Sequence, residues 1–470
     1  MGRTVRPRRI TKRGSLFGGT GRMGPAAAPP YSPAMDEVAE ATPDYAALAT
    51  SLSPVLGRYF ERSWSHGDGH RLFDTAGKAY LDFANGIAVT VLGHRHPAVS
   101  AAIHDQVDRL IGPTGAIGYA EPVVRLASMV ADTLPEPIDT VMFMNSGSEA
   151  VEGALKLARR ASGRPAIIAF EGGFHGRTFG AASVTTSSLN YRVGYEPLLP
   201  SVYFAPFPVA YRDFDGDDDR ATRESMVALR RLTSTAVPPS AVGAILIEPI
   251  QGEGGYYPAP PAFLRELRAF CDEHGILLIA DEVQSGYART GRMWGFEHAG
   301  IVPDVVCIAK AIANGLPLSA IATRRELQER WGRGAHGSTF GGNPVACAAG
   351  VAVLDTIRHE RLVDNAAERG AELTTGLRAL AAEDSRIGDV RGPGLMIGLE
   401  FVEDGDSAKP DGPRAQAVQE RAAELGLLLL TCGPAHQVVR WIAPLDVTRA
   451  EIAESVEIFG EALRTAEARV

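Results

Sequence analysis

Five short apolar segments in the middle of the chain constrain its fold more than any other feature. They lie at 139–144, 165–170, 243–247, 276–280 and 304–309. Longer amphipathic segments separate them, and candidate helices lie at 148–161, 261–274 and 343–357. Continuous apolar strands that alternate with helices are typical of a mostly parallel sheet covered on both faces. The pattern therefore predicts an α/β fold in which ligands bind beyond the carboxyl ends of the strands.

Residues with reactive or anion-binding groups follow each of these strands. In chain order, the strand ends lead to the turn 145–148, to Phe174 and His175, to Glu248, to Asp281 and to Lys310. Because the carboxyl ends of parallel strands meet at one edge of a sheet, we expect these side chains to lie together. The sequence thus predicts one rim with a phosphate-type turn, an aromatic ring, two acids and a lysine.

Lys310 and Asp281 each have an ordinary and a chemical interpretation. A lysine directly after a buried strand is poorly solvated, which favours the neutral amine that forms a Schiff base with an aldehyde. Alternatively, Lys310 extends to the surface. A buried carboxylate keeps a pyridine nitrogen protonated, whereas an ordinary Asp281 would cap a helix. A helix cap does not account for the coincidence of the two residues.

The turn "NSGSEA" at 145–150 opens a predicted helix. Backbone N–H groups at a helix start, together with the hydroxyls of Ser146 and Ser148, form a seat for a phosphate group. The same residues suit a plain serine N-cap with Glu149 in the first turn, and both interpretations hold together. Phe174 adds a flat face on which a ring can stack. A lysine, an acid, a phosphate turn and an aromatic ring together predict a site for pyridoxal 5'-phosphate.

Several longer motifs resemble one enzyme family. They are "LLIADEVQSGYARTGRMWGFEHAGIVPDVVCIAKAIANGLPL", "NSGSEAVEGALKLAR", "FHGRT", "IEPIQGEGG" and "HGSTFGGNPVACAA". The chain resembles the class III pyridoxal phosphate-dependent aminotransferases of fold type I over roughly residues 55–460. Its motifs at 387–410 and 427–445 resemble the bacterial 4-aminobutyrate aminotransferases in particular. The resemblance implies a large domain at 96–354 with a mostly parallel seven-stranded sheet, and a smaller α+β domain formed by 45–95 and 355–470.

The resemblance also implies which residues hold the cofactor. Lys310 resembles the lysine that forms the Schiff base and moves the proton, and Asp281 resembles the partner of the pyridine nitrogen. The other positions that correspond to cofactor-binding residues are Ser146, Gly147, Ser148, Phe174, His175, Val283, Gln284 and Thr339. Thr339 resembles a threonine that reaches the phosphate from the neighbouring subunit. This implies a homodimer with shared active sites, alone or as a dimer of dimers.

Two arginines are candidates for carboxylate recognition, since a guanidinium binds a carboxylate through two parallel hydrogen bonds. The resemblance implies that Arg177 binds the distal carboxylate of the substrate and that Arg440 binds the α-carboxylate of glutamate. Glu253 would pair with Arg440 while 4-aminobutyrate, which has a single carboxylate, is bound. Ile87 would form an apolar wall of the substrate pocket, and Glu248 is a further candidate substrate residue. Both arginines could instead belong to structural ion pairs.

These residues predict an aminotransferase that moves the amino group of an ω-amino acid, chiefly 4-aminobutyrate, to 2-oxoglutarate and yields the semialdehyde and L-glutamate. Acetylornithine or ornithine aminotransfer and amino-acid racemisation are alternatives that keep the cofactor. The pairing of Glu253 with Arg440 argues against a simple racemase, which has no second carboxylate to manage. A non-enzymatic protein that kept the fold is a further alternative, against which intact Lys310 and Asp281 argue.

Composition and charge argue against several other classes. The formal net charge is −9, which does not suggest a nucleic-acid partner, and no apolar stretch is long enough to cross a bilayer. Four separated cysteines are expected to be reduced thiols in a cytoplasmic protein. The basic segment 1–44 is expected to be a disordered tail, with Met35 as an alternative start of translation. The acidic loop 213–224 and the histidine motifs at 66–70 and 93–97 are interpreted as a solvated loop and as turns, without a metal.

Overall fold

A seven-stranded sheet forms the centre of the fold in a computed structural model that describes residues 45, 49–113 and 115–466. The strand order is β4-β10-β9-β8-β7-β5-β6. The strands are β4 (Thr140–Met144), β5 (Ala166–Phe170), β6 (Val202–Ala205), β7 (Val242–Ile247), β8 (Leu277–Asp281), β9 (Val305–Ile308) and β10 (Ser319–Thr323). All five apolar segments predicted as strands lie in this sheet, which β6 and β10 complete.

The central sheet is parallel apart from one strand. β10 runs antiparallel to both of its neighbours, β4 and β9, whereas β6, β5, β7, β8 and β9 pair in parallel. Parallel strands need long crossover connections, which accounts for the amphipathic segments between them. The predicted α/β fold with a mostly parallel seven-stranded sheet is confirmed.

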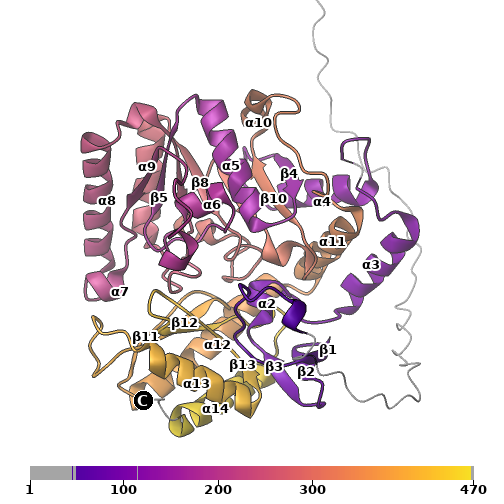
Figure 1. The fold of residues 1–470 in the computed structure, drawn as a ribbon, viewed down its shortest axis with the longest axis vertical. Helices are drawn as coiled ribbons and strands as arrows, with labels where there is room; N and C mark the ends of the chain where they lie inside the picture. The colour runs from indigo at the N-terminus through magenta and orange to yellow at the C-terminus, as the bar shows by residue number, and fades with distance from the viewer. Residues whose placement is uncertain (1–44, 46–48, 114, 467–470) are drawn as a thin grey trace, which may run out of the picture. The chain divides into compact units, whose positions relative to one another are not determined.

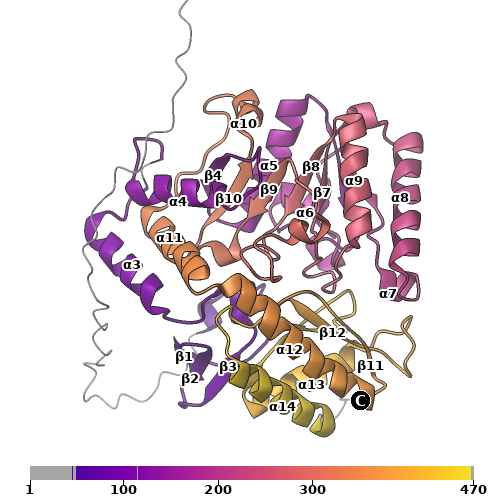
Figure 2. The same ribbon diagram turned by 180° about the vertical axis from the view of Figure 1, so that it is seen from behind.

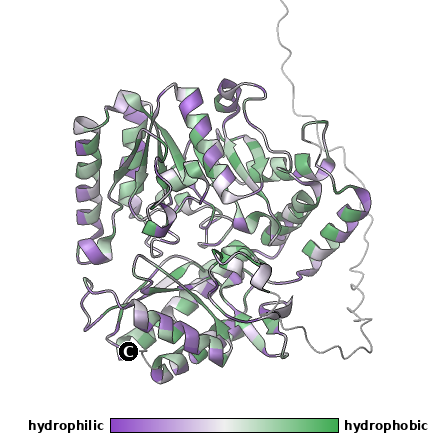
Figure 3. Ribbon diagram, in the orientation of Figure 1, coloured by the Kyte–Doolittle hydropathy of each residue, from purple (hydrophilic) through white to green (hydrophobic). Residues whose placement is uncertain are grey.

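Successive residues of each central strand point to opposite helical layers. Leu246 and Ile279 pack with residues of helix α5 on one face, and Ile245 and Leu278 pack with residues of helix α9 on the other. Figures 1 and 2 show the two layers from opposite sides, and Figure 3 shows how hydrophobic the central strands are. The helices around this sheet are α3 (Pro97–Arg109), α4 (Glu121–Ala131), α5 (Gly147–Ser162), α6 (Phe179–Val184), α7 (Ala210–Asp213), α8 (Asp218–Thr235), α9 (Pro261–His274), α10 (Arg325–Trp331) and α11 (Pro344–His359). The three predicted helices correspond to α5, α9 and α11.

Two smaller sheets lie outside the central sheet, and the first of them combines strands from the beginning and the end of the described chain. One has the order β1-β2-β3-β13 and the other has the order β11-β12-β15-β14. Their strands are β1 (Trp64–Asp68), β2 (Arg71–Asp74), β3 (Ala79–Asp82), β11 (Ile387–Arg391), β12 (Ile397–Phe401), β13 (Leu427–Leu428), β14 (Leu430–Cys432) and β15 (Val438–Trp441). The helices of this region are α2 (Asn85–Ala88), α12 (Leu362–Glu383), α13 (Gly412–Leu425) and α14 (Arg449–Thr465). Because β13 pairs in parallel with β3, we propose that 45–95 and 355–470 form one domain and 96–354 another.

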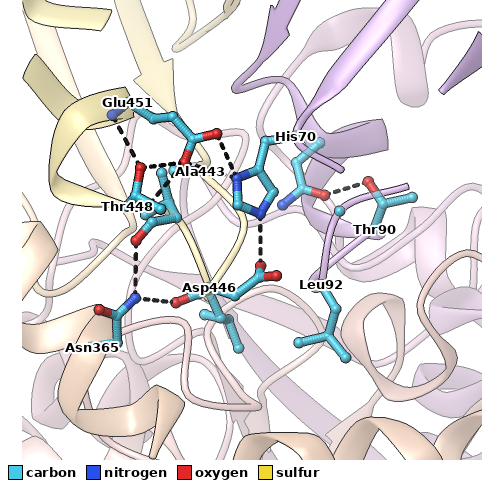
Figure 4. Close-up of polar contacts among 12 residues, drawn as sticks. His70, Thr90, Leu92, Asn365, Ala443, Asp446, Thr448 and Glu451 are labelled. Carbon is cyan, nitrogen blue, oxygen red and sulfur yellow. Dashed lines mark hydrogen bonds and ion pairs between the residues drawn. The ribbon is translucent and has the colours of Figure 1, made fainter. Parts of the chain in front are cut away.

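A half-buried histidine connects the turn between β1 and β2 to the start of α14 (Figure 4). The two ring nitrogens of His70 lie 2.9 Å from Glu451 Oε1 and 3.1 Å from Asp446 Oδ1. Glu451 also completes a capping box with Thr448 at the N-terminus of α14. Although burial lowers the pKa of His70, the two carboxylates raise it to about 9. The histidine motif at 66–70 therefore contributes an ion pair between distant segments.

Within 45, 49–113 and 115–466, no three histidine, cysteine or acidic side chains gather in a way that could hold a metal ion. None of the helices in the same ranges is long and apolar enough to cross a membrane. The four cysteine thiols are buried and free, as predicted: Cys271, Cys307, Cys347 and Cys432. The predicted tail at 1–44 and the alternative start at Met35 lie outside the described residues.

Candidate active site

The carboxyl ends of the central parallel strands meet at a cavity of about 300 Å³. The predicted residues that line it are Ser146, Gly147, Ser148, Phe174, His175, Glu248, Asp281, Val283, Gln284 and Lys310. The predicted residues outside this lining are Ile87, Arg177, Glu253, Thr339 and Arg440. The sheet thus brings together the groups that were expected on one rim from the order of the strands alone.

Asp281, the last residue of β8, is held on the wall of the cavity by two contacts. Its Oδ2 lies 2.7 Å from Nδ1 of His175, and its Oδ1 accepts a hydrogen bond of 3.1 Å from the amide of Val283. His175 is almost completely buried. Burial lowers the pKa of His175, but its hydrogen bond to Asp281 and the charge of that carboxylate raise it above the usual value. The two contacts therefore fix the Asp281 carboxylate in position at the end of a buried strand.

Glu248 follows β7 and is also buried. Its two carboxylate oxygens accept hydrogen bonds from the backbone amides of Phe174 (2.9 Å) and Gly252 (2.8 Å). Burial raises the pKa of Glu248 to about 7. Glu248 thus ties together the two loops that follow β5 and β7, and it also lines the cavity.

Lys310 lies two residues after the end of β9, with Ala309 between them. Its backbone has a φ of +48°, an uncommon conformation for a residue with a side chain. Burial lowers the pKa of Lys310, and the carboxylate of Glu253 partly opposes this effect. The side chain therefore offers its neutral amine to the cavity more readily than an exposed lysine does.

The turn before α5 also lines the cavity. Ser146 Oγ accepts a hydrogen bond of 3.2 Å from the amide of Glu149, so it is the N-cap of the helix. A Cβ atom at Gly147 would lie 3.0 Å from Cγ1 of Val283, so glycine allows the close approach of the turn to the strand end. The first amides of a helix lack intrahelical partners and attract anions. The N-cap and the anion-binding interpretation are thus compatible here.

Aromatic side chains surround Arg177, which is exposed. Its guanidinium carbon lies 4.9 Å from the ring centre of Tyr191 and 5.9 Å from that of Phe174. The two rings meet edge to face with centres 5.2 Å apart. The backbone amide of Arg177 donates a hydrogen bond of 3.2 Å to Ser148 Oγ. Arg177 is therefore adjacent to two lining residues of the cavity.

Arg440 on β15 is completely buried and forms an ion pair with Glu253. Its other terminal nitrogen donates a hydrogen bond of 2.9 Å to the hydroxyl of Tyr59. Burial raises the pKa of Glu253, but the positive charges of Arg440, Lys310 and Arg177 lower it below the usual value. The amine and both guanidinium groups thus act on the same carboxylate.

Two other predicted residues, Ile87 and Thr339, are exposed to solvent. Ile87 follows β3 with a φ of +67° and a partly exposed side chain. Thr339 is exposed in the segment before α11, beside Phe340. An exposed Thr339 is what a residue that reaches a neighbouring subunit requires, and its role stays a prediction.

Residues that the sequence did not single out also contact the site. Tyr59 bonds to Arg440, and the hydroxyl of Tyr256 donates a hydrogen bond of 2.5 Å to Oε1 of Gln284. Tyr191, whose ring lies against the guanidinium of Arg177, is a third such residue. A single tyrosine in an irregular segment has no periodic pattern or paired partner that would identify it.

Comparisons with known proteins agree with this geometry. A family model described as aminotransferase class-III matches residues 57–463. The chain is 40% identical over 392 residues to the 4-aminobutyrate aminotransferase GabT of Escherichia coli (strain K12), with 83% of this chain and 91% of the relative covered. It is 39% identical to the 5-aminovalerate aminotransferase DavT of Pseudomonas aeruginosa, with 87% and 93% covered.

A relative named for a different substrate, acetylornithine, is as similar to this chain as the 4-aminobutyrate aminotransferase is. The acetylornithine aminotransferase of Methanopyrus kandleri is 41% identical, with 85% of this chain and 93% of the relative covered. Among solved structures, an amine transaminase from an uncultivated Pseudomonas species, in its PLP-bound form, matches with a TM-score of 0.81 and 32% identity. That match covers 89% of this chain and 98% of the other.

Proposed function

The chain belongs to the class III aminotransferases, and on that premise we propose that it transfers the amino group of 4-aminobutyrate to 2-oxoglutarate. The products are the semialdehyde and L-glutamate. The observation that carries this proposal is the ion pair between Glu253 and the buried Arg440, close enough to Lys310 for their charges to interact. An enzyme that accepts a monocarboxylate and a dicarboxylate in turn at one site needs a carboxylate-binding group that can be neutralised internally.

The cavity suits pyridoxal 5'-phosphate as the cofactor. The turn 146–148 supplies helix-start amides and hydroxyls for the phosphate, and Asp281 supplies a fixed negative charge for the pyridine nitrogen. Val283 and Phe174 would lie against the faces of the ring, and Gln284 would bind its phenolic oxygen or the phosphate. When bound, pyridoxal 5'-phosphate supplies an aldehyde and an electron-withdrawing ring.

The side chains of the protein transfer the proton and bind the carboxylates of the substrates. Lys310 Nζ accepts and returns the proton that moves during transamination, for which its lowered pKa suits it. His175 keeps Asp281 oriented through their 2.7 Å contact. Arg177 binds the carboxylate of 4-aminobutyrate, and Arg440 remains paired with Glu253. When glutamate binds, its α-carboxylate replaces Glu253 on Arg440.

We propose that the protein works as a homodimer in which Thr339 completes the site of the neighbouring subunit. The apolar side chains Val107, Ile111 and Phe340 are 43%, 58% and 65% exposed. They line a shared depression of about 340 Å³. Exposed apolar patches of this kind mark protein interfaces. Thr339 directly precedes Phe340, so a partner on this surface would bring Thr339 close to another active site.

Acetylornithine is the second candidate amino donor, and the relative from Methanopyrus kandleri favours it. The substrates are distinguished by assay of the purified holoenzyme. Amino donors of increasing length, including 4-aminobutyrate, 5-aminovalerate, ornithine and acetylornithine, are offered with 2-oxoglutarate, and glutamate formation is followed. We expect the highest kcat/KM for 4-aminobutyrate. A higher kcat/KM for acetylornithine would make acetylornithine the substrate in place of 4-aminobutyrate. Racemisation of an optically pure amino acid in the absence of 2-oxoglutarate would indicate a racemase.

A further inference from the structure

The loop 251–257, which carries Glu253, lies against one face of the sheet β11-β12-β15-β14. In that sheet Gly398 pairs with Arg391 on one side and with Arg440 on the other. Paired residues, and residues two apart along a strand, point to the same face. Arg391, Glu400 and Arg440 therefore share the face that meets the loop. A Cβ atom at Gly398 would lie 2.9 Å from Cβ of Tyr256, so the loop approaches this face closely.

Four side chains form a buried network next to Glu253, here named the Glu400 cluster: Arg212, Tyr257, Arg391 and Glu400. Glu400 has no exposed surface. One of its oxygens accepts a hydrogen bond of 2.7 Å from the hydroxyl of Tyr257 and lies 2.7 Å from Nη2 of Arg391. Its other oxygen pairs with Arg212. A second acid, Asp389, lies 2.9 Å from Nη1 of Arg391, so two acids balance two arginines.

The Glu400 cluster fixes the backbone of the loop. Nε and Nη2 of Arg391 donate hydrogen bonds of 3.1 and 2.5 Å to the carbonyl of Gly255. The guanidinium carbon of Arg391 lies 3.8 Å from the ring centre of Tyr257. The amide of Gly433 donates a hydrogen bond of 2.9 Å to the carbonyl of Glu253 itself. These contacts hold the backbone on both sides of the Glu253 side chain, so a change of its partner would require only a rotation of that side chain.

We propose that Tyr257 and Glu400 are positioning residues for Glu253 that set the discrimination between monocarboxylate and dicarboxylate substrates. This inference rests on the proposed function, in which Glu253 neutralises Arg440 while the ω-amino acid is bound. Loosening the loop would leave a buried guanidinium without a fixed counter-charge in that half-reaction. The glutamate half-reaction tolerates the change because the α-carboxylate of the substrate occupies Arg440.

The test uses Tyr257→Phe in the holoenzyme, because this change keeps the ring on Arg391. It removes the hydroxyl that donates a hydrogen bond to Glu400 and accepts one of 3.0 Å from Nε of Arg212. We expect kcat/KM for 4-aminobutyrate to fall about tenfold and that for glutamate to change less than about twofold. Glu400→Gln should also lower the ratio of kcat/KM for 4-aminobutyrate to kcat/KM for glutamate. Tyr287→Phe is the matched control, since this buried hydroxyl has no hydrogen-bond partner among the residues that the structure describes.

A double-mutant cycle separates positioning from general stability. In a Glu253→Ala background, Tyr257→Phe should no longer change the ratio of the two kcat/KM values. A ratio shift that persists in that background would overturn the inference, as would equal losses in both half-reactions.

Hydrogen exchange supplies a readout that does not depend on the substrate. The Gly433 amide should exchange faster in Tyr257→Phe than in wild type or Tyr287→Phe, because its acceptor is the carbonyl of Glu253. Unchanged exchange would contradict the anchoring of the loop. If the wild-type enzyme uses neither 4-aminobutyrate nor glutamate, the proposed function fails, and the exchange rate still decides whether the cluster holds the loop.

Discussion

Glu253 and Arg440 form an ion pair in which the guanidinium is completely buried and the carboxylate is largely so. Removing one partner of a buried pair leaves an uncompensated charge, at a cost of about 3–5 kcal/mol. A ligand that displaces Glu253 must therefore bring its own carboxylate to Arg440. The pair can exclude ligands without such a group from this position and admit those that have it.

Replacing Arg440 should affect the two half-reactions unequally. Arg440→Ala removes the group that we propose binds the α-carboxylate of glutamate, and we expect kcat/KM for glutamate to fall at least about 100-fold. The value for 4-aminobutyrate, whose carboxylate is assigned to Arg177, should fall about tenfold or less. Single-turnover absorbance measurements with each substrate give both values. Equal losses would contradict the exchange of carboxylates at Arg440.

Replacing Lys310 should remove the covalent attachment of the cofactor. Lys310→Ala leaves the phosphate turn and Asp281 in place, so pyridoxal 5'-phosphate should still bind, but without the near-visible absorbance of a lysine-bound aldehyde. Turnover should be lost with it. Lys409→Ala, at a half-exposed lysine that contacts Asp406, is the control and should keep both properties. A Lys310→Ala protein with an unchanged spectrum would refute the assignment of the lysine.

The residues at the rim of the cavity could be predicted from the sequence because each one is identified by its own short segment of the chain. Asp281 and Lys310 each end an apolar run, and a parallel sheet brings such ends together wherever the strands lie in the chain. The strand β10 was not predicted, since Ser319 and Thr323 make its five residues look polar at both ends. β6 was not predicted because its four residues form only a short apolar run. In the structure most of them are half-buried.

Contacts between distant segments could not be read from the sequence. Glu400 meets Arg212 and Tyr257 across 188 and 143 positions of the chain. Each of these residues is ordinary in its own segment, and only the folded sheet defines them as a group. The same holds for Tyr59, whose contact with Arg440 spans 381 positions. Pattern and spacing identify residues at strand ends, whereas buried polar networks depend on the complete tertiary fold.

Mixed dimers should reveal whether active sites are shared. A dimer of one Lys310→Ala chain and one Thr339→Ala chain has one intact site if Thr339 acts on its neighbour, and none if it acts within its own chain. We expect one site per mixed dimer with wild-type affinity for pyridoxal 5'-phosphate, measured by fluorescence titration of dimers purified through two different tags. Thr339→Ala homodimers should bind the cofactor about tenfold more weakly. Weak binding at every site of the mixed dimer would place Thr339 in its own subunit's site.

The pairing of His70 with Asp446 and Glu451 should make stability depend on pH in a defined range. The folded-state pKa of His70 is raised from 6.5 to about 9. Its contribution is therefore complete below pH 6.5 and is lost as the pH rises through 9. The pKa of Glu451 is lowered to about 2, despite burial, chiefly by its hydrogen bond with His70, so this carboxylate stays charged from pH 6 to 10.

We accordingly expect His70→Gln to lower the free energy of unfolding by about 2–3 kcal/mol at pH 6 and by much less at pH 10. Urea denaturation of the holoenzyme at pH 6, 8 and 10 measures the difference. His66→Gln, at an exposed histidine of the same motif, should change stability by less than about 0.5 kcal/mol throughout. A His70→Gln deficit that is the same at pH 6 and pH 10 would mean that packing, and not the charge of the imidazolium, joins β1 and β2 to α14.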